Sequence, residues 1–194
     1  MRMTENRDLF WELLEPEYTR ALMFCRKLAG DRDVGDDLYQ DALLTAYTRF
    51  TDLREHASFR PWLYRVIVTT FRQTVRRPWW RRRLPFTTQV EESLTGADPS
   101  DSHAARRWLE RAFQAVTPEE QALVTLYELE EWTVGELAEL FGKRPGAIKT
   151  RLHRARRRMK DVLAAYAKGQ KLPVERNTTT SEVKPCTATK PKNG

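Results

Sequence analysis

The chain has 194 residues, with 34 Lys or Arg against 27 Asp or Glu, and its formal net charge is +7 at pH 7. A basic balance of this size favours an anionic partner such as nucleic acid. The two cysteines offer no disulfide framework, so we expect a reducing, cytoplasmic environment. No apolar run has the length of a membrane span, and residues 1–8 lack the apolar segment of a signal peptide, so we expect no membrane insertion.

Residues 8–83 carry apolar side chains at intervals of three and four, the spacing of amphipathic helices. The pattern begins at Leu9, is broken or restarted at Pro16 and turns at 30–33, and it includes Cys25, which we expect to be a buried thiol. A helix is predicted over about 34–50 and a loop over 51–57. Another helix follows, which Ser58 is expected to cap and which runs into the basic segment 76–83. The sequence thus predicts an all-α domain over 8–83.

The composition changes over 84–103, where Pro85, Gly96 and Pro99 accompany four acidic residues and no Lys or Arg. We expect a flexible acidic linker there and a second helical domain over 104–167. The tail, 168–194, is rich in Thr, Lys and Pro and is predicted to be basic and disordered. The predicted fold class is therefore all-α, with two small helical domains joined by a linker.

Two helix starts in the second domain have the pattern of a capping box, in which a threonine and a glutamate three residues later bond each other's backbone N–H groups. The pairs are Thr117 with Glu120 and Thr133 with Glu136. Gly142 permits a left-handed turn, and Pro145 suits the first position of the helix that follows. Residues 132–160 are therefore predicted to form a helix-turn-helix.

The second helix of this unit is strongly basic on one side. Ile148, Leu152 and Ala155 can pack back on the first helix. The opposite face carries Lys149, Arg151, Arg154, Arg156, Arg157, Arg158 and Lys160. A helix of this kind suits the major groove of DNA, where Arg and Lys meet phosphates and guanine edges. The alternative is a solvated amphipathic helix pair.

Taken together, residues 8–165 resemble the extracytoplasmic-function group of bacterial RNA polymerase sigma factors. The resemblance in the second domain lies in the segments 118–129 (PEEQALVTLYEL), 133–138 (TVGELA) and 146–156 (GAIKTRLHRAR). In the first domain it lies in 37–43 (DLYQDAL) and 59–68 (FRPWLYRVIV). Thr69 is a departure, because the family usually has there an Asn that contributes to a pocket for an unstacked promoter base. The preferred base at that position is left open.

The resemblance implies that the second domain recognises the upstream (−35) promoter element as duplex DNA. It places Lys149, Thr150, His153 and Arg154 on the groove side of the recognition helix, with Lys149 and Arg154 as candidates for base edges. Arg144, Arg151 and Arg157 are candidates for phosphates, which set register and not sequence. For any one of these charges the alternative is a solvated side chain.

The resemblance also implies that the first domain melts the downstream (−10) element and holds single-stranded DNA. Stacking on aromatic side chains and a fitted pocket offset the cost of unstacking a base. The candidates are Arg54, His56, Phe59, Trp62, Tyr64, Arg65, Thr69, Arg72, Arg76 and Arg77. Phe59 and Trp62 are alternatively core residues. Trp79 and Trp80 either stack on bases or pack against the second domain.

Core RNA polymerase is the protein partner that the resemblance implies, through its β′ clamp helices. Asp37, Gln40 and Asp41 would form the docking surface, because residues four apart share a helix face. The alternative is that they are ordinary solvent-exposed polar side chains with no docking role. A dedicated anti-sigma factor is a further implied partner.

No metal, no cofactor and no enzymatic activity are expected. The three histidines are scattered without metal-ligand spacing, and no glycine cluster forms a phosphate-binding loop. Three alternatives to a sigma factor stay open. One is a stand-alone helix-turn-helix regulator that never binds core polymerase, another is an enzyme acting on nucleic acid, and the third is a family member that has lost melting.

Overall fold

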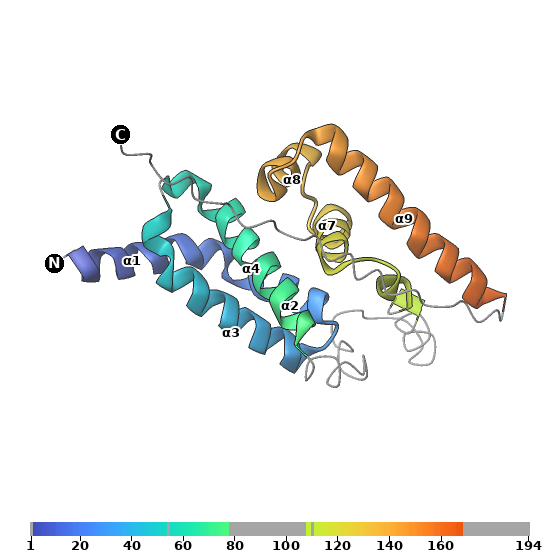
Figure 1. Cartoon of the computed structure of the whole chain (residues 1–194). Helices are drawn as coiled ribbons and strands as arrows, with labels where there is room; N and C mark the ends of the chain where they lie inside the picture. The colour runs from blue at the N-terminus through green and yellow to red at the C-terminus, as the bar shows by residue number, and fades with distance from the viewer. Residues whose placement is uncertain (1, 54, 78–107, 110, 169–194) are drawn as a thin grey trace, which may run out of the picture.

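A computed structural model describes residues 2–53, 55–77, 108–109 and 111–168, and within these ranges the regular elements are all helices (Figure 1). The predicted all-α class is therefore confirmed. Arg54, Trp79, Trp80 and Cys186 lie outside the described residues, as do the predicted linker over 84–103 and the predicted tail beyond residue 168.

Within the described residues, the first domain contains four α-helices and three short 3-10 turns. They are α1 (Arg2–Leu14), η1 (Glu15–Glu17), α2 (Tyr18–Ala29), α3 (Arg32–Thr48), η2 (Phe50–Asp52), η3 (His56–Ser58) and α4 (Phe59–Arg76). The 3-10 turn around Pro16 confirms the predicted interruption, and Gly30 ends α2 at a φ of 69°. The backbone N–H of Val34 donates to the side chain of Asp31, which therefore caps α3.

The predicted N-cap at Ser58 is wrong. Ser58 makes no side-chain capping hydrogen bond, and its φ and ψ of −91° and 10° are not the extended values of a cap residue. The reason is local, because η3 leads directly into α4 and the chain enters the helix already turning. The serine before a run of periodically spaced apolar residues correctly predicted where a helix starts. It did not predict whether the serine side chain caps that helix.

The second domain contains α7 (Pro118–Leu129), α8 (Val134–Phe141) and α9 (Pro145–Ala167), preceded by helical residues at 108–109 and 111–114. Both predicted capping boxes form, at Thr117 and at Thr133. Gly142 adopts a φ of 60°, and Pro145 is the first residue of α9. The helix-turn-helix is therefore confirmed in its capping, its turn and its packing, with Ile148, Leu152 and Ala155 buried.

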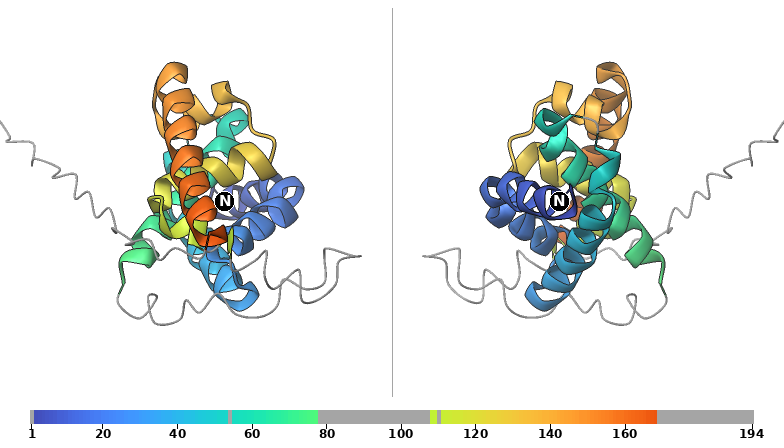
Figure 2. Two further views of the ribbon diagram at one scale, coloured as in Figure 1. Left: turned by 90° about the vertical axis from the view of Figure 1, so that its right-hand side faces the viewer. Right: turned by 90° about the vertical axis from the view of Figure 1, so that its left-hand side faces the viewer.

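The two domains pack against each other, with α7 contacting both α2 and α4, and α8 contacting α4 (Figure 1). One hydrophobic cluster runs from Phe10 and Leu14 in α1 through Ile67 in α4 to Leu126 in α7 and Leu152 in α9. The two side views show the same close association of the helices (Figure 2). The sequence predicted both domains, but a core shared between them was not predicted.

Candidate nucleic-acid interface

The basic face of α9 is open to solvent. Arg144, Lys149, Thr150, His153, Arg154 and Arg157 are all exposed, whereas Ile148, Leu152 and Ala155 on the other side of the helix are buried. The hydroxyl of Thr150 donates to the carbonyl of Gly146 at 3.0 Å, so it is bonded within its own helix. The arrangement can present Lys149, His153 and Arg154 together to the edge of a DNA groove.

Three other arginines of α9 are held by acidic side chains of α7. Arg151 donates to Glu119 at 2.6 Å, Arg156 to Glu128 at 2.5 Å, and Arg158 to Glu120. Burial raises the pKa of Glu120, but hydrogen bonds from Thr117 and Arg158 outweigh it and hold that pKa below its usual value. These three pairs fix α9 on α7 and thereby set the direction of its exposed face.

The candidate residues of α4 divide into an exposed stripe and a buried set. Trp62, Arg65, Thr69, Arg72 and Arg76 are three or four positions apart and lie on one side of α4, with all but the half-buried Trp62 exposed. Arg77, which follows the helix, is exposed as well. The stripe joins a line of positive charge to one indole ring, which is the composition of a single-strand binding groove.

The buried set contains Phe59 and Tyr64, which were both candidates for base stacking. Phe59 is 3% exposed and packs edge-to-face with Phe10, so its alternative role in the core describes this structure. Tyr64 is fully buried, with Phe24 of α2 at 5.3 Å and Trp132 from the second domain at 4.9 Å between ring centroids. Neither ring is accessible to a DNA base in this arrangement.

Trp62 and His56 belong to an aromatic cluster at the start of α4. The imidazole of His56 stacks on Phe50 with 6.2 Å between ring centroids, and Trp62 contacts both Phe50 and Phe59. His56 is exposed and Trp62 is half-buried. The cluster therefore offers two partly accessible rings beside the exposed stripe of α4.

Thr69 lies in the middle of the stripe, and its hydroxyl donates to the carbonyl of Arg65 at 2.8 Å. This bond returns the side chain to its own helix, as is common for threonine inside helices. A threonine held in this way presents its methyl group and the acceptor side of its hydroxyl, and it has no amide to donate.

A second exposed stripe runs along α3. Asp37, Gln40 and Asp41 lie on one side of the helix, and Leu44 and Tyr47 continue the same line one and two turns further on. Leu44 is 65% exposed and Tyr47 is 42% exposed, which is unusual for large apolar side chains placed side by side. Neither residue was predicted to lie on this surface, and Tyr47 was expected on the apolar face of the helix, although their spacing from Asp37 and Gln40 was a signal that could have identified them.

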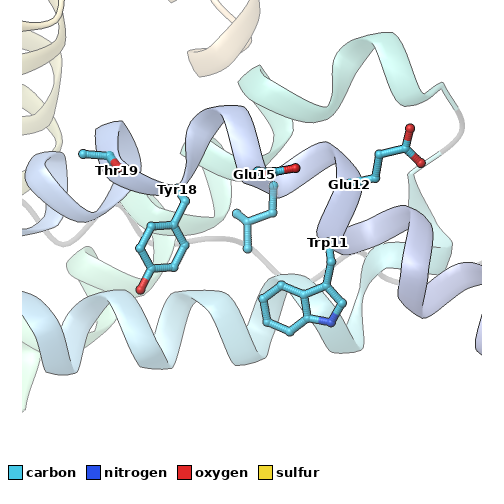
Figure 3. A pocket seen from close by; sticks show the side chains of 6 residues that line it. Trp11, Glu12, Glu15, Tyr18 and Thr19 are labelled. Carbon is cyan, nitrogen blue, oxygen red and sulfur yellow. The ribbon is translucent and has the colours of Figure 1, made fainter.

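A shallow hollow between α1, η1 and α2 extends this apolar surface. Trp11 and Tyr18 line it together with Glu12 and Glu15, and both rings point towards α3 (Figure 3). Tyr18 contacts the ring of Tyr39 in α3, and Tyr47 of α3 contacts the ring of Phe10 in α1. The face formed by α1 and α3 is thus aromatic at its centre and acidic at its rim.

In the part of the chain that the structure describes, no three or more His, Cys, Asp or Glu side chains are grouped so as to hold a metal ion. Within the same ranges, every helix is too short or too polar to cross a membrane. Cys25 is fully buried, and burial raises the pKa of its thiol, so it is a packing residue and not a nucleophile.

Comparison with known protein families assigns both domains. The family description "Sigma-70 region 2" matches residues 13–81, and "Sigma-70, region 4" matches residues 106–159. The RNA polymerase sigma-E factor of Streptomyces coelicolor is 32% identical over 164 residues, which cover 79% of this chain and 89% of that protein. The ECF RNA polymerase sigma factor SigE of Mycolicibacterium smegmatis is 26% identical over 161 residues, covering 80% and 62% respectively.

A solved structure has the same fold. The sigma factor RpoE of Bartonella quintana, in complex with the anti-sigma factor NepR, matches with a TM-score of 0.57 at 19% identity, covering 80% of this chain and 96% of that one. These domains and their order define a transcription initiation factor of the sigma-70 class. The chain belongs to the extracytoplasmic-function group of sigma factors.

Proposed function

We propose that this sigma factor binds core RNA polymerase through α3 and gives it promoter specificity through two DNA-binding faces. The exposed face of α9 would bind the −35 element as duplex, and the exposed stripe of α4 would hold the melted strand of the −10 element. The chain would supply binding and specificity, while the chemistry of RNA synthesis stays with the polymerase. This activity belongs in the cytoplasm, where the polymerase and the promoter are.

One observation carries the proposal. The acidic and apolar stripe on α3 and the basic face of α9 are both exposed, and they lie within the segments that match sigma regions 2 and 4. A protein that bound DNA alone would have no need for the stripe of Leu44, Tyr47 and acids on α3. An apolar centre with a charged rim is typical of a protein-docking surface.

We assign the docking surface to Asp37, Gln40 and Asp41 together with Leu44 and Tyr47. The acids can attract a basic partner and set its orientation, and the exposed apolar side chains provide the area that is removed from water. The hollow beside Trp11 and Tyr18 is next to this surface and could receive a side chain of the docked helix.

Reconstituted transcription tests the proposal. Purified chain and sigma-free core polymerase are incubated with fragmented genomic DNA, and the transcripts are sequenced from their 5′ ends. We expect a stable complex with core and a small set of discrete start sites that share two sequence elements. Sequence-specific duplex binding by a chain that never associates with core would instead support the stand-alone regulator.

A further inference from the structure

The face formed by α1 and α3 carries acidic side chains that no cation of the described chain neutralises. Within the described residues, the carboxylates of Glu12, Glu15 and Asp41 form no ion pair. The acids of α7 that face α9 differ, because each of them is paired with an arginine of that helix. In a chain whose net charge is +7, this face is therefore a local negative region that attracts a cation from another molecule.

The hollow beside Trp11 and Tyr18 provides the apolar part of this face. Its volume is about 500 Å³, which leaves room for one long side chain. Leu14 lines it as a buried residue, whereas Trp11 and Tyr18 are each 47% exposed. The two rings point towards α3, and the carboxylates of Glu12 and Glu15 point away from it (Figure 3). Rings and acids thus border the same hollow on different sides.

Neighbouring aromatic rings hold the two exposed rings in place. Trp11 packs edge-to-face with Phe10, and Tyr18 packs edge-to-face with Tyr39, each with 5.5 Å between the centroids. About half of the surface of each ring stays open to solvent despite these contacts. A partner group that binds there therefore meets rings that are already positioned, which lowers the entropic cost of binding.

We propose that this hollow receives one arginine or lysine side chain from the helix of core polymerase that docks on α3. The proposal rests on the proposed function, and it names the chemistry of one contact at that docking surface. A long basic side chain fits both parts of the hollow, because its methylene stem packs on the rings and its charged head lies near aromatic faces and carboxylates. An aliphatic side chain would leave the acids without a partner.

Continuity with the docking surface on α3 identifies the source of this side chain. Trp11 contacts Phe10, and Phe10 contacts Tyr47 of the docking surface. Tyr18 contacts Tyr39, which lies between residues of the docking surface in the sequence of α3. The hollow and the exposed stripe of α3 are therefore parts of one surface. Its acids repel phosphates, so this surface is unsuited to promoter DNA.

The acids and the rings should act on different steps of binding. Charges at the rim of an interface mainly change the association rate and its dependence on salt. An aromatic side chain that is desolvated at the centre of a contact mainly slows dissociation. The two parts of the hollow can therefore be tested separately by kinetic measurements.

Binding to immobilised, sigma-free core polymerase in the absence of DNA tests the rings. Trp11→Leu keeps an apolar side chain at the hollow but removes the ring that attracts a cation. We expect the variant to dissociate from core at least about tenfold faster than the wild type, with Trp11→Phe between the two. Trp11→Leu should bind duplex DNA as the wild type does and have the same helix content by circular dichroism, which a misfolded variant would not.

A pair of double variants tests the acids. Glu12→Gln with Glu15→Gln removes both charges from the hollow and keeps the shape of the side chains. Glu131→Gln with Glu139→Gln makes the same change at two exposed residues of the second domain and is the matched control. Each double variant raises the net charge from +7 by two, to +9. Only the first should associate with core more slowly, roughly three- to tenfold at about 50 mM salt, and the difference should disappear near about 0.5 M salt.

Three outcomes would overturn the proposal. Trp11→Leu could dissociate as slowly as the wild type, which would make the hollow an ordinary apolar contact or no contact. The two double variants could bind core alike, which would leave the acids without a role. Sedimentation could show a dimer of the free wild type that Trp11→Leu abolishes, which would assign the hollow to a second copy of this chain. A wild type that bound no core would contradict the proposed function and this inference with it, whereas the three outcomes above leave the proposed function intact.

Discussion

Trp132, between α7 and α8, packs its indole ring on the phenol ring of Tyr64 in α4, with 4.9 Å between the centroids. Tyr64 belongs to the first domain and Trp132 to the second, so this pair couples the stabilities of the two. An aromatic pair adds about 0.5–1.5 kcal/mol beyond the burial of its area. We expect a coupling energy of this size from a double-mutant cycle with Tyr64→Leu and Trp132→Leu, measured by urea unfolding.

A second cycle provides the reference for that experiment. Phe59→Leu combined with Trp132→Leu should be additive within about 0.5 kcal/mol, because Phe59 packs with Phe10 and Trp62 inside the first domain. If Tyr64 and Trp132 also proved additive, the two domains would not share a core in solution.

Local signals in the sequence predicted most of the second domain. The capping boxes at Thr117 and Thr133 and the left-handed turn at Gly142 depend on residues at most four positions apart, which a sequence displays directly. The failed cap at Ser58 is the instructive exception, because the 3-10 turn before α4 changed the backbone that a capping side chain requires.

The burial of Tyr64 could not be predicted in the same way. Its ring packs on Phe24 of the first domain and is also covered by Trp132, which comes from a segment some 70 residues away. The contact between Arg65 and Leu140 spans a similar separation of 75 residues. Placing such a contact requires knowledge of how the domains dock, which periodicity does not contain. The clue that was present was Trp132 itself, a large apolar residue directly before a capped helix with no assigned partner.

At Gly35, α3 lies directly against the backbone of α2, and we expect Gly35→Ala to destabilise the first domain. A Cβ at this position would lie 2.5 Å from the Cα and 2.9 Å from the backbone N of Arg26, so a backbone must shift. Overpacking of this kind costs about 1–3 kcal/mol. Thermal unfolding of the variant measures the loss.

Gly135→Ala is the matched substitution in α8 and should have the opposite sign. Its Cβ would meet nothing nearer than the hydroxyl of Thr133 at 3.8 Å, and alanine is favoured over glycine in a helix by about 1 kcal/mol. Equal effects of the two substitutions would mean that helix propensity, and not the contact between α2 and α3, decides the outcome at Gly35.

Asp41→Lys should weaken binding to core polymerase at least about tenfold, because it places a like charge against a basic partner at a docking surface. The association rate and the affinity are measured with immobilised core at two salt concentrations. Asp52→Lys makes the same charge change in η2, at a residue outside the assigned docking surface, and should leave core affinity unchanged. An unaltered affinity for the Asp41 variant would mean that the docking surface lies elsewhere.

Arg154→Ala should reduce affinity for the upstream element more than affinity for random duplex. A lost contact to a base edge costs about 1–3 kcal/mol on the cognate site only, whereas a lost phosphate contact weakens all sequences alike. Arg156→Ala is the comparison, because Arg156 is paired with Glu128 and stacks over Tyr127. Competition binding with the promoter found by transcript sequencing and with a random duplex distinguishes a base-edge contact from a phosphate contact. Equal losses of affinity on both duplexes would contradict the base-edge assignment for Arg154.

The stability of the helix-turn-helix depends on pH through the carboxylate of Glu136. Hydrogen bonds from the backbone N–H and hydroxyl of Thr133, with help from Arg60, lower the pKa of Glu136 from its usual 4.5. Below that value the unfolded chain binds more protons than the folded one, so the stabilisation is complete above pH 4.5 and is lost as the pH falls. The difference in unfolding free energy between wild type and Glu136→Gln should therefore be constant near neutral pH and shrink in acid.

Urea unfolding at steps between about pH 7 and pH 3 measures this difference, and comparing two variants removes the titration of the other carboxylates. Thr133→Ala removes the hydroxyl from the same capping box and should cost about 0.5–2 kcal/mol at neutral pH. It should also flatten the acid dependence, since part of what lowers the pKa of Glu136 is then gone. A difference between wild type and Glu136→Gln that stays constant down to the lowest pH would show that the charge of Glu136 contributes nothing to the cap.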